Sequence, residues 1–404
     1  MHHEYSYIYY DYSWYHPAMI DRQDHLSNLK RLLRDYPVVA ILGARQIGKT
    51  TLAGELARSR RGPVTTFDLE DTAALARLQD PALTLAPLKG LVVLDEIQRR
   101  PELFQTLRVL ADRRPVRTQF LVLGSANPSL LRQSSETLAG RIAFYELPGL
   151  SLTEVPAADL SKLWLRGGFP RAFLARDDAG SYEWRQNFIR TFVERDLPQL
   201  GVTIGAETMR RFWTMLAHHH AQLWNSSELA RAFGVADKTV RGYLDRLCDA
   251  LVIRQLSPWH ENLAKRQVKS PKVYVRDAGL LHALLGVPTD RDLGGHPKLG
   301  ASWEGFVIEQ VITQLRLRFS ECYFWRTYQG AELDLLVIRG RQRIGFEIKH
   351  TSAPLLTPSM RAAVNDLKLD SLSVVHAGAD TFPMADRIKA VAATDLTGML
   401  RKLH

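Results

Sequence analysis

One segment constrains the fold of this chain more than any other. It runs GARQIGKT from Gly43 to Thr50 and fits the pattern G-x-x-x-x-G-K-[ST]. A strand-like apolar run, residues 38–42, precedes it, and a helix-like stretch begins at Thr51. Glycines let backbone N–H groups curl around phosphate oxygens, and the start of a helix adds a positive dipole. The segment therefore predicts a phosphate-binding loop between a strand and a helix.

This motif assigns a role to each of its polar residues. Lys49 is expected to reach the β- and γ-phosphates of ATP, and the Thr50 hydroxyl to hold Mg²⁺. The apolar run 91–94 ends in Asp95, a second expected Mg²⁺ ligand, and Glu96, expected to orient or deprotonate water. The full set of expected nucleotide contacts is Gly43, Gln46, Gly48, Lys49, Thr50, Thr51 and Ser125.

Two further polar positions are candidates for sensing the nucleotide. The apolar run 119–123 leads into Gly124-Ser125-Ala126-Asn127, where either Ser125 or Asn127 is suited to sense the γ-phosphate. Arg141 is a candidate sensor, or an arginine finger acting across a subunit boundary. The alternative for Arg141, a plain surface arginine, is equally compatible with the sequence.

The spacing of apolar runs predicts an α/β protein in several parts. Five short runs separated by helix-like stretches indicate a parallel sheet covered on both faces, at residues 38–42, 64–67, 91–94, 119–123 and 142–145. A helical region follows, then an amphipathic helix over about 302–319 and strands at 322–325, 333–338 and 344–348. The expected parts are an arm rich in Tyr (1–20), a P-loop domain (21–150), a helical region (151–300) and a small α/β domain (301–404).

Together the motifs carry a family resemblance. GARQIGKTTL, LDEIQ, GSANPSLL and ETLAGRI resemble the AAA-type ATPases of bacteria and archaea that carry a C-terminal domain of unknown function, over about residues 20–390. The resemblance implies an AAA-type P-loop domain of the ASCE class, a helical winged-helix middle and a C-terminal domain with an endonuclease-like α/β fold. It also implies a homo-oligomer, for which a hexamer is the usual AAA arrangement.

The middle region contains a helix-turn-helix pattern. Residues 226–234 and 237–244 form its two expected helices, with Ser226 or Ser227 capping the first, Gly234 ending it and Asp237 capping the second. The second helix either enters the major groove of DNA or packs on the nucleotide domain and relays its state. A basic run at 251–276 is the best local candidate for a phosphate track. The expected DNA contacts are Lys238, Thr239, Arg241, Lys265, Arg266 and Lys269.

Carboxylates recur in the last hundred residues. Asp334 and Glu347-Ile348-Lys349 give D-x(12)-E-x-K across an apparent hairpin at Gly340. Glu304 in the preceding helix is expected to complete a metal site, with Glu309 as a weaker alternative. Carboxylates hold Mg²⁺ and a lysine positions water for attack on a phosphodiester. This order of residues resembles the restriction-endonuclease and Holliday-junction-resolvase superfamily, which implies metal-dependent cleavage; the alternative is a nuclease-shaped scaffold with a structural charge network.

Composition narrows the partners and the compartment. The net charge of +10 favours an acidic partner such as DNA, and two cysteines, Cys248 and Cys322, fit a reducing compartment. Since no apolar run reaches the roughly 18 residues that a membrane span needs, a cytoplasmic protein is expected.

The sequence thus predicts an ATPase (ATP and water to ADP and phosphate) that engages DNA and carries a nuclease-like site. Two other functions remain open. One is an ATP-driven switch whose C-terminal domain only binds a partner. The weaker one is a site-specific transcription factor, which leaves the P-loop and the carboxylates unexplained.

Overall fold

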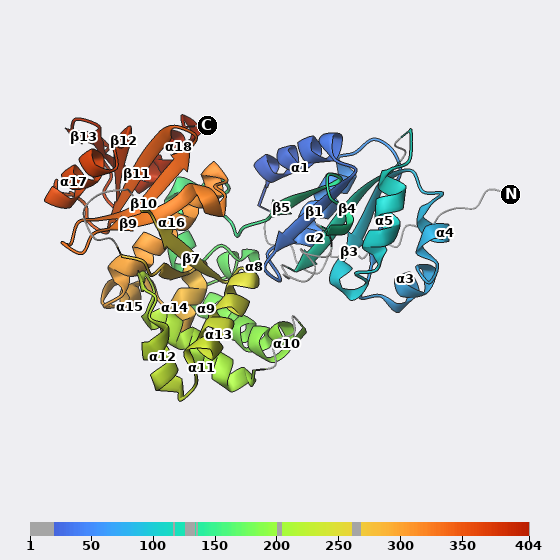
Figure 1. Ribbon diagram of the computed structural model, residues 1–404, viewed down its shortest axis with the longest axis horizontal. Helices are drawn as coiled ribbons and strands as arrows, with labels where there is room; N and C mark the ends of the chain where they lie inside the picture. Colours follow the sequence, from blue (N-terminus) through green and yellow to red (C-terminus); the bar gives the residue numbers. More distant parts are fainter. Residues whose placement is uncertain are drawn as a thin grey trace.

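The computed structural model describes residues 20–115, 118–125, 134, 136–199, 204–260 and 268–403. The chain forms two lobes (Figure 1), with the first sheet in one lobe and all later helices and strands in the other. The Tyr-rich arm lies outside the described residues, apart from Ile20. Within the described part of the chain, no helix combines the length and apolar character that crossing a membrane requires.

The first lobe is built on a five-stranded parallel sheet in the order β2-β3-β4-β1-β5. Its strands are β1 (Val38–Gly43), β2 (Val64–Asp68), β3 (Gly90–Asp95), β4 (Thr118–Ser125) and β5 (Ile142–Glu146). Its helices are α1 (Gln23–Asp35), α2 (Lys49–Arg58), α3 (Thr72–Arg77), α4 (Pro81–Leu85) and α5 (Leu103–Ala111). Each of the five strands predicted from apolar runs is confirmed.

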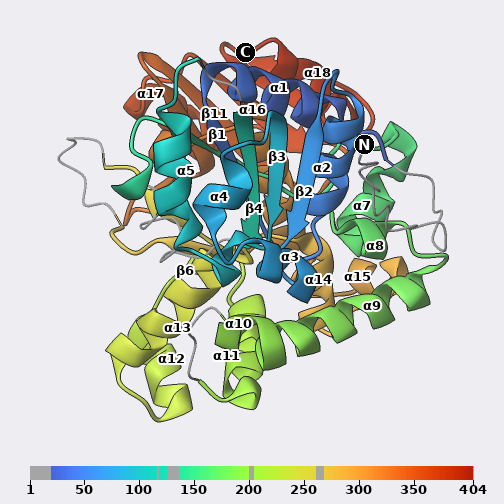
Figure 2. The ribbon, with the colours of Figure 1, turned by 90° about the vertical axis from the view of Figure 1, so that its right-hand side faces the viewer.

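Both faces of this sheet are buried, as continuous apolar strands require. Val39 and Ile41 face a core shared with α1 and α2, whereas Val38 and Ala40 face a core shared with α3, α4 and α5. Figure 2 looks onto this lobe, with α5 and α2 on opposite sides of the strands. Because all strands are parallel, their carboxyl ends lie along one edge, where polar residues gather.

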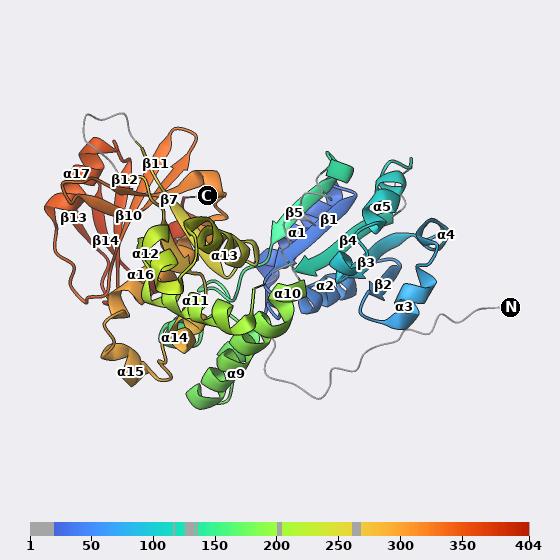
Figure 3. The same ribbon diagram turned by 60° about the horizontal axis from the view of Figure 1, so that its bottom comes forward.

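The middle of the chain is mainly helical. A π-helical turn (Phe192–Asp196) joins α9 to α10, two helices that are labelled in Figure 3. Its helices are α7 (Leu160–Arg166), α8 (Pro170–Phe173), α9 (Asp178–Thr191), α10 (Leu197–Gln199), α11 (Ala206–His218), α12 (Ser226–Phe233), α13 (Asp237–Asp249), α14 (Ala278–Leu284) and α15 (Asp290–Gly294). Its strands are β6 (Gln222–Leu223), β7 (Ile253–Pro258) and β8 (Lys272–Val275).

The second sheet runs across the boundary that the sequence suggested near residue 300. It has nine strands in the order β13-β14-β12-β11-β10-β9-β7-β8-β6, because β7 pairs in parallel with β9. The middle region and the C-terminal part therefore share one sheet. Its later strands are β9 (Cys322–Arg326), β10 (Glu332–Arg339), β11 (Gln342–Lys349), β12 (Ser371–His376), β13 (Phe382–Ala385) and β14 (Ile388–Ala392).

Helices cover both faces of the C-terminal strands. On one face α16 (Leu299–Leu315) and α18 (Leu396–Arg401) pack on Val337 and Phe346, and on the other α17 (Pro358–Asp366) packs on Leu336 and Val374. The expectation of an amphipathic helix over 302–319 is wrong on two points: α16 ends at Leu315, before the left-handed Arg316, and it is buried on almost every side. Strands β9, β10 and β11 lie where the sequence predicted them.

Candidate functional site

The glycine-rich loop joins β1 to α2 at the carboxyl edge of the first sheet. Gln46 (φ 62°) and Gly48 (φ 99°) both take the left-handed backbone conformation, which turns the loop into the helix. A Cβ on Gly43 would lie 2.8 Å from the Leu147 carbonyl oxygen, so the strand can end there only in glycine. The first turn of α2 is exposed at Thr50 and Thr51, where free helix N–H groups favour an anion.

Lys49 lies inside this loop. Its Nζ donates to the carbonyl oxygens of Gly43 (3.1 Å) and Ala44 (3.0 Å), and the residue is only 6% exposed. Burial lowers the pKa of this ammonium, opposed by the nearby carboxylates of Glu96 and Asp95. The amino group of Lys49 therefore lies where the motif predicts the phosphates of a nucleotide.

The carboxylates that end β3 face the start of α2. Thr50 Oγ1 donates to Asp95 Oδ2 at 2.7 Å, and the Glu96 amide donates to Asp95 Oδ1 at 2.8 Å. Burial raises the pKa of both Asp95 and Glu96 from their ordinary values. A hydroxyl and a carboxylate in contact are the oxygen ligands that Mg²⁺ prefers, so Thr50 and Asp95 fit the ion implied by the motif.

The candidate sensor residues are placed unequally. The backbone of Ser125 pairs with Gly43 at the end of β4, so this position lies at the edge of the loop. Asn127 lies outside the described residues. Arg141 precedes β5 at the opposite edge of the sheet, where its guanidinium contacts both carboxylate oxygens of Asp112 at 2.6 and 3.0 Å. A sensor role toward the loop of its own chain is therefore wrong, while a role across a subunit boundary stays a prediction.

One contact of the loop had no signal in the sequence. Arg45 reaches out of the loop to Asp196, at 2.7 Å between Nη1 and Oδ1, and lies 4.0 Å from Glu70. Asp196 ends the π-helical turn of the middle region. The middle region thus forms an ion pair with the loop itself, and Phe169 and Ala172 belong to the same apolar core as Ala44 and Ile47.

The C-terminal carboxylates predicted as one group do come together. Asp334 and Glu347 are 7% and 5% exposed, and burial together with the nearby carboxylate of Glu304 raises the pKa of both. Burial, then these like charges, raise the pKa of Asp334 well above its usual range. Lys349 Nζ lies 2.8 Å from Glu347 Oε1. Residues from α16, β10 and β11 thus form one charged cluster.

Two members of this carboxylate cluster, Lys272 and Glu332, were not predicted as site residues. Lys272, on β8, places its Nζ 2.6 Å from Glu332, 3.1 Å from Glu304 and 3.8 Å from Asp334, in each case to one carboxylate oxygen. Among the described residues, no three His, Cys, Asp or Glu side chains are arranged to hold a metal ion. The donor set has suitable chemistry for Mg²⁺, but in this arrangement the Lys272 ammonium stands among the carboxylates, and metal binding by Glu304, Asp334 and Glu347 stays a prediction.

The basic run at 251–276 proves to be largely internal. Arg254 and Arg276 both pair with Glu309, and Arg276 also pairs with Glu146 of β5 at 2.6 Å. Glu309 therefore serves this ion-pair chain and is not the alternative cluster residue that the sequence suggested. Lys265 and Arg266 lie outside the described residues, and Lys269 is exposed. Paired and buried arginines cannot form a phosphate track, so that interpretation is wrong for these positions.

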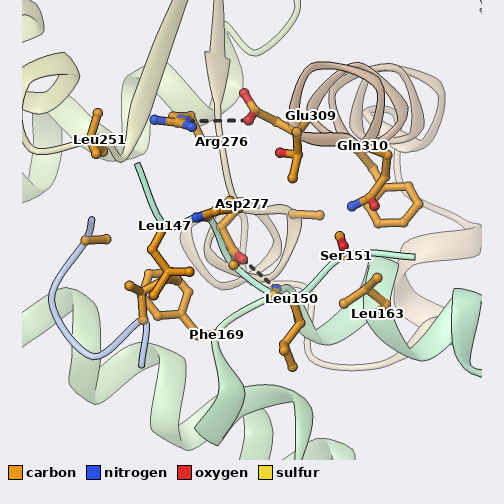
Figure 4. A pocket seen from close by; sticks show the side chains of 18 of the residues that line it. Leu147, Leu150, Ser151, Leu163, Phe169, Leu251, Arg276, Asp277, Glu309 and Gln310 are labelled. Carbon is orange, nitrogen blue, oxygen red and sulfur yellow. Dashed lines mark hydrogen bonds and ion pairs between the residues drawn. The ribbon is translucent and has the colours of Figure 1, made fainter. Parts of the chain in front are cut away.

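The ion-pair chain borders a pocket where the lobes meet. The pocket has a volume of about 80 Å³ and is lined from the loop, the middle region and α16, by residues that include Ile47, Phe169, Asp277 and Gln310. Figure 4 shows the contact between Arg276 and Glu309 at its rim. Asp277 accepts hydrogen bonds from the Gly168 and Leu280 amides, so its buried carboxylate is fully engaged in holding these segments.

The helix-turn-helix pattern forms as two helices followed by an antiparallel pair of strands, β7 and β8. Gly234 ends α12 at φ 65°, and Val240, Leu244 and Leu247 form the buried face of α13, as predicted. The capping residues differ: Asn225 caps α12, and Asp237 accepts from Ser226 and Ser227 instead of capping α13. Lys238, Thr239 and Arg241 are exposed on α13.

Comparisons with known proteins match the three parts separately. An AAA domain matches residues 35–156, and two domains of unknown function, DUF8612 and DUF4143, match residues 157–291 and 299–396. The AAA match and the parallel sheet identify the first part as an AAA-type P-loop domain.

Two curated proteins are similar along nearly the whole chain. They are the uncharacterized proteins Rv2008c of Mycobacterium tuberculosis and Mb2031c of Mycobacterium bovis, each 50% identical over 387 residues, covering 95% of this chain and 87% of theirs. Among solved structures, the Walker-type ATPase of Pyrococcus abyssi has a TM-score of 0.46 at 15% identity, covering 66% of this chain and 96% of that one.

Proposed function

The chain belongs to the same family as the mycobacterial protein Rv2008c, and because its first part is an AAA-type P-loop domain, we propose that it binds and hydrolyses ATP at the Gly43–Thr50 loop. The observation that carries the proposal is the contact between Thr50 and Asp95, at 2.7 Å, beside the buried ammonium of Lys49. It joins the two motifs, 45 residues apart in sequence, into one site.

Each residue of this site has a separate task. Lys49 neutralises the phosphates, and Thr50 and Asp95 would hold Mg²⁺, which supplies charge stabilisation between the phosphates when bound. Glu96 orients the attacking water or takes its proton, and its raised pKa brings it nearer to the range useful for a general base. The products are ADP and phosphate.

The test compares three variants of the full chain. Lys49→Ala is expected to lose nucleotide binding and hydrolysis, whereas Glu96→Gln is expected to keep ATP binding and lose about 10²–10⁴-fold in kcat. Glu102→Gln, a change of an exposed glutamate six residues further on, is the matched control and keeps the wild-type rate. Hydrolysis at the wild-type rate in Lys49→Ala would exclude this site.

For the C-terminal part we propose a nuclease-like site at Glu304, Asp334, Glu347 and Lys349. Its support is the convergence of these side chains from α16, β10 and β11, together with Glu347 Oε2, which is buried with no hydrogen-bond partner among the described residues. Incubating linear, branched and single-stranded DNA with Mn²⁺, with and without ATP, is expected to give cleavage that Asp334→Ala abolishes. Equal cleavage by Asp334→Ala would assign it to a contaminant.

A switch without cleavage is the second candidate, and a specific feature favours it. The ion-pair chain from Glu146 through Arg276 to Glu309 connects the P-loop lobe to α16, which also carries Glu304. ATP would then change how the C-terminal part holds a protein or nucleic acid. ATP-dependent partner binding with no cleavage under any metal condition identifies this function.

DNA contact is proposed for the exposed start of α13. Lys238, Thr239 and Arg241 lie on this surface, and Lys269 is exposed elsewhere in the middle region. Changing both Lys238 and Arg241 to Ala is expected to weaken DNA binding and to reduce its salt dependence, because two phosphate contacts are lost. Arg210→Ala, on the exposed side of α11, is the control, and equal loss in both variants would place the contact elsewhere.

A further inference from the structure

Lys272 is the most unusual member of the carboxylate cluster. It is 3% exposed, yet it comes from β8 of the middle region and not from the C-terminal part that supplies the carboxylates. Its Nζ contacts Glu332, Glu304 and Asp334, and it lies 5.6 Å from the centre of the Phe324 ring. A buried ammonium is stable only where carboxylates surround it, so these contacts fix its position.

The segment that carries Lys272 is built to hold it there. Two residues along β8, Tyr274 donates its hydroxyl to Glu304 Oε1 at 2.6 Å, so both side chains project from the same face of the strand. Lys272 Nζ and the Tyr274 hydroxyl therefore meet the same carboxylate, Glu304, and the strand places both of them inside the cluster.

The cluster nevertheless keeps an unsatisfied oxygen. Glu347 Oε2 is buried without a hydrogen-bond partner among the described residues, although Glu347 Oε1 pairs with Lys349. The carboxylates of Glu304, Glu332, Asp334 and Glu347 thus lie in one cluster with Lys272 and Lys349. Among the described residues, one buried oxygen of this cluster, Glu347 Oε2, has no hydrogen-bond partner. A divalent ion would satisfy that acceptor, but like charges repel, and the Lys272 ammonium already contacts Glu304 and Asp334, which such an ion would share.

We propose that Lys272 is a resident counter-cation that keeps a divalent metal ion out of the carboxylate cluster, and that metal binds only when this side chain leaves the cluster. The proposal rests on the cluster function proposed above. Under this proposal a residue of the middle region controls whether metal enters the C-terminal site. Lys272 lies on β8, which pairs with β7, and β7 directly follows α13 in the chain.

Direct metal binding tests this. In the full chain without nucleotide, Lys272→Met keeps the length and apolar stem of the side chain and removes its charge. Calorimetry is expected to show Mn²⁺ binding at least roughly tenfold tighter than in wild type, a gain that adding Asp334→Asn removes. Lys269→Met, three residues away and exposed, is the matched control and is expected to bind Mn²⁺ like wild type. Equal Mn²⁺ affinity in wild type and Lys272→Met overturns the proposal.

A second measurement uses the wild-type protein and so does not depend on the folding of a variant. Amine acetylation followed by peptide mass spectrometry reports the reactivity of each lysine. Millimolar Mn²⁺ is expected to raise the labelling rate of Lys272 several-fold while that of Lys269 stays constant. An unchanged Lys272 rate contradicts displacement.

The two proposals fail in different experiments. If Lys272→Met gains the Mn²⁺ site but cleaves no DNA, the nuclease-like function is wrong and the counter-cation role stands.

Discussion

At the scale of single residues, Gly43 shows how little room the nucleotide loop has. A Cβ at this position would lie 2.8 Å from the Leu147 carbonyl oxygen and 3.0 Å from Ile47 Cγ2. The carbonyl belongs to backbone that cannot rotate away, so Gly43→Ala is expected to displace the loop and to weaken ATP binding about tenfold or more. Fluorescent-nucleotide titration measures the loss.

Gly54 in α2 is the matched control for that change. Nothing lies within 4 Å of a Cβ built there, so alanine is accommodated and should stabilise the helix by about 0.5–1 kcal/mol. Nucleotide affinity in Gly54→Ala should equal that of wild type. If Gly43→Ala binds ATP equally well, the loop adapts and the steric argument is wrong.

At the scale of elements, a buried ion pair fastens α1 to the segment after β5. Arg22 and His25, at the start of α1, both contact Glu154, the latter at 3.5 Å. Burial would raise the pKa of Glu154, but the hydrogen bond from His25 and the charge of Arg22 hold it at about 2. This group is ionised in the folded chain at pH values where the unfolded chain protonates it.

The sign of the pH dependence follows from that difference. Because the folded pKa lies below the ordinary 4.5, the stabilisation is complete above 4.5 and is lost as the pH falls toward 2. Glu154→Gln is expected to lower the free energy of unfolding by about 2–4 kcal/mol at pH 7 and to converge with wild type near pH 2. Denaturant unfolding across this range checks it; parallel curves for the two proteins would contradict the assignment.

The inner strands of the first sheet, which the sequence predicted correctly, have one property in common, which is that both of their faces are buried. Strands such as β1 and β3 are short apolar runs because both of their faces are buried, and that property is local to the run. The Thr50–Asp95 contact was also predictable, since a phosphate loop and a strand ending in Asp-Glu imply one edge of one sheet.

What the sequence did not predict depends on partners far along the chain. In the sequence, Lys272 is one of the basic residues of the candidate phosphate track at 251–276. A count of charges does not show which carboxylates lie around each of these residues in the fold. Its position in Lys272-Val-Tyr-Val, a strand-like run of apolar neighbours, was the available signal that the lysine is buried. Asp196 and Glu146 carried no such signal, since each acts only through an arginine in another part.

At the scale of the whole molecule, Arg45 and Asp196 connect the nucleotide loop to the middle region. The pair spans 151 residues of sequence and joins the loop to the π-helical turn beside α10. We expect nucleotide binding to alter this contact, because phosphates compete for the same guanidinium. Hydrogen exchange in α10 and α11 should then change on ATP addition in wild type and stay unchanged in Asp196→Asn.

Asp177→Asn gives the control for that experiment, since Asp177 caps α9 at its other end and does not contact the loop. Its exchange response to ATP should match that of wild type. A full response in Asp196→Asn would show that the signal does not pass through this pair.

The nine-stranded sheet also bears on how such a chain can diversify. Since β7 pairs with β9, a recombination event between residues 291 and 299, where the two domains of unknown function meet, would separate two hydrogen-bonded strands and remove Lys272 from its carboxylates. Exchange at residue 156 breaks no strand pair of either sheet. Exchange at residue 156 would still separate Arg45 from Asp196 and Glu146 from Arg276, so we expect relatives that exchange the P-loop domain to differ at these pairs and to inherit residues 157–396 together.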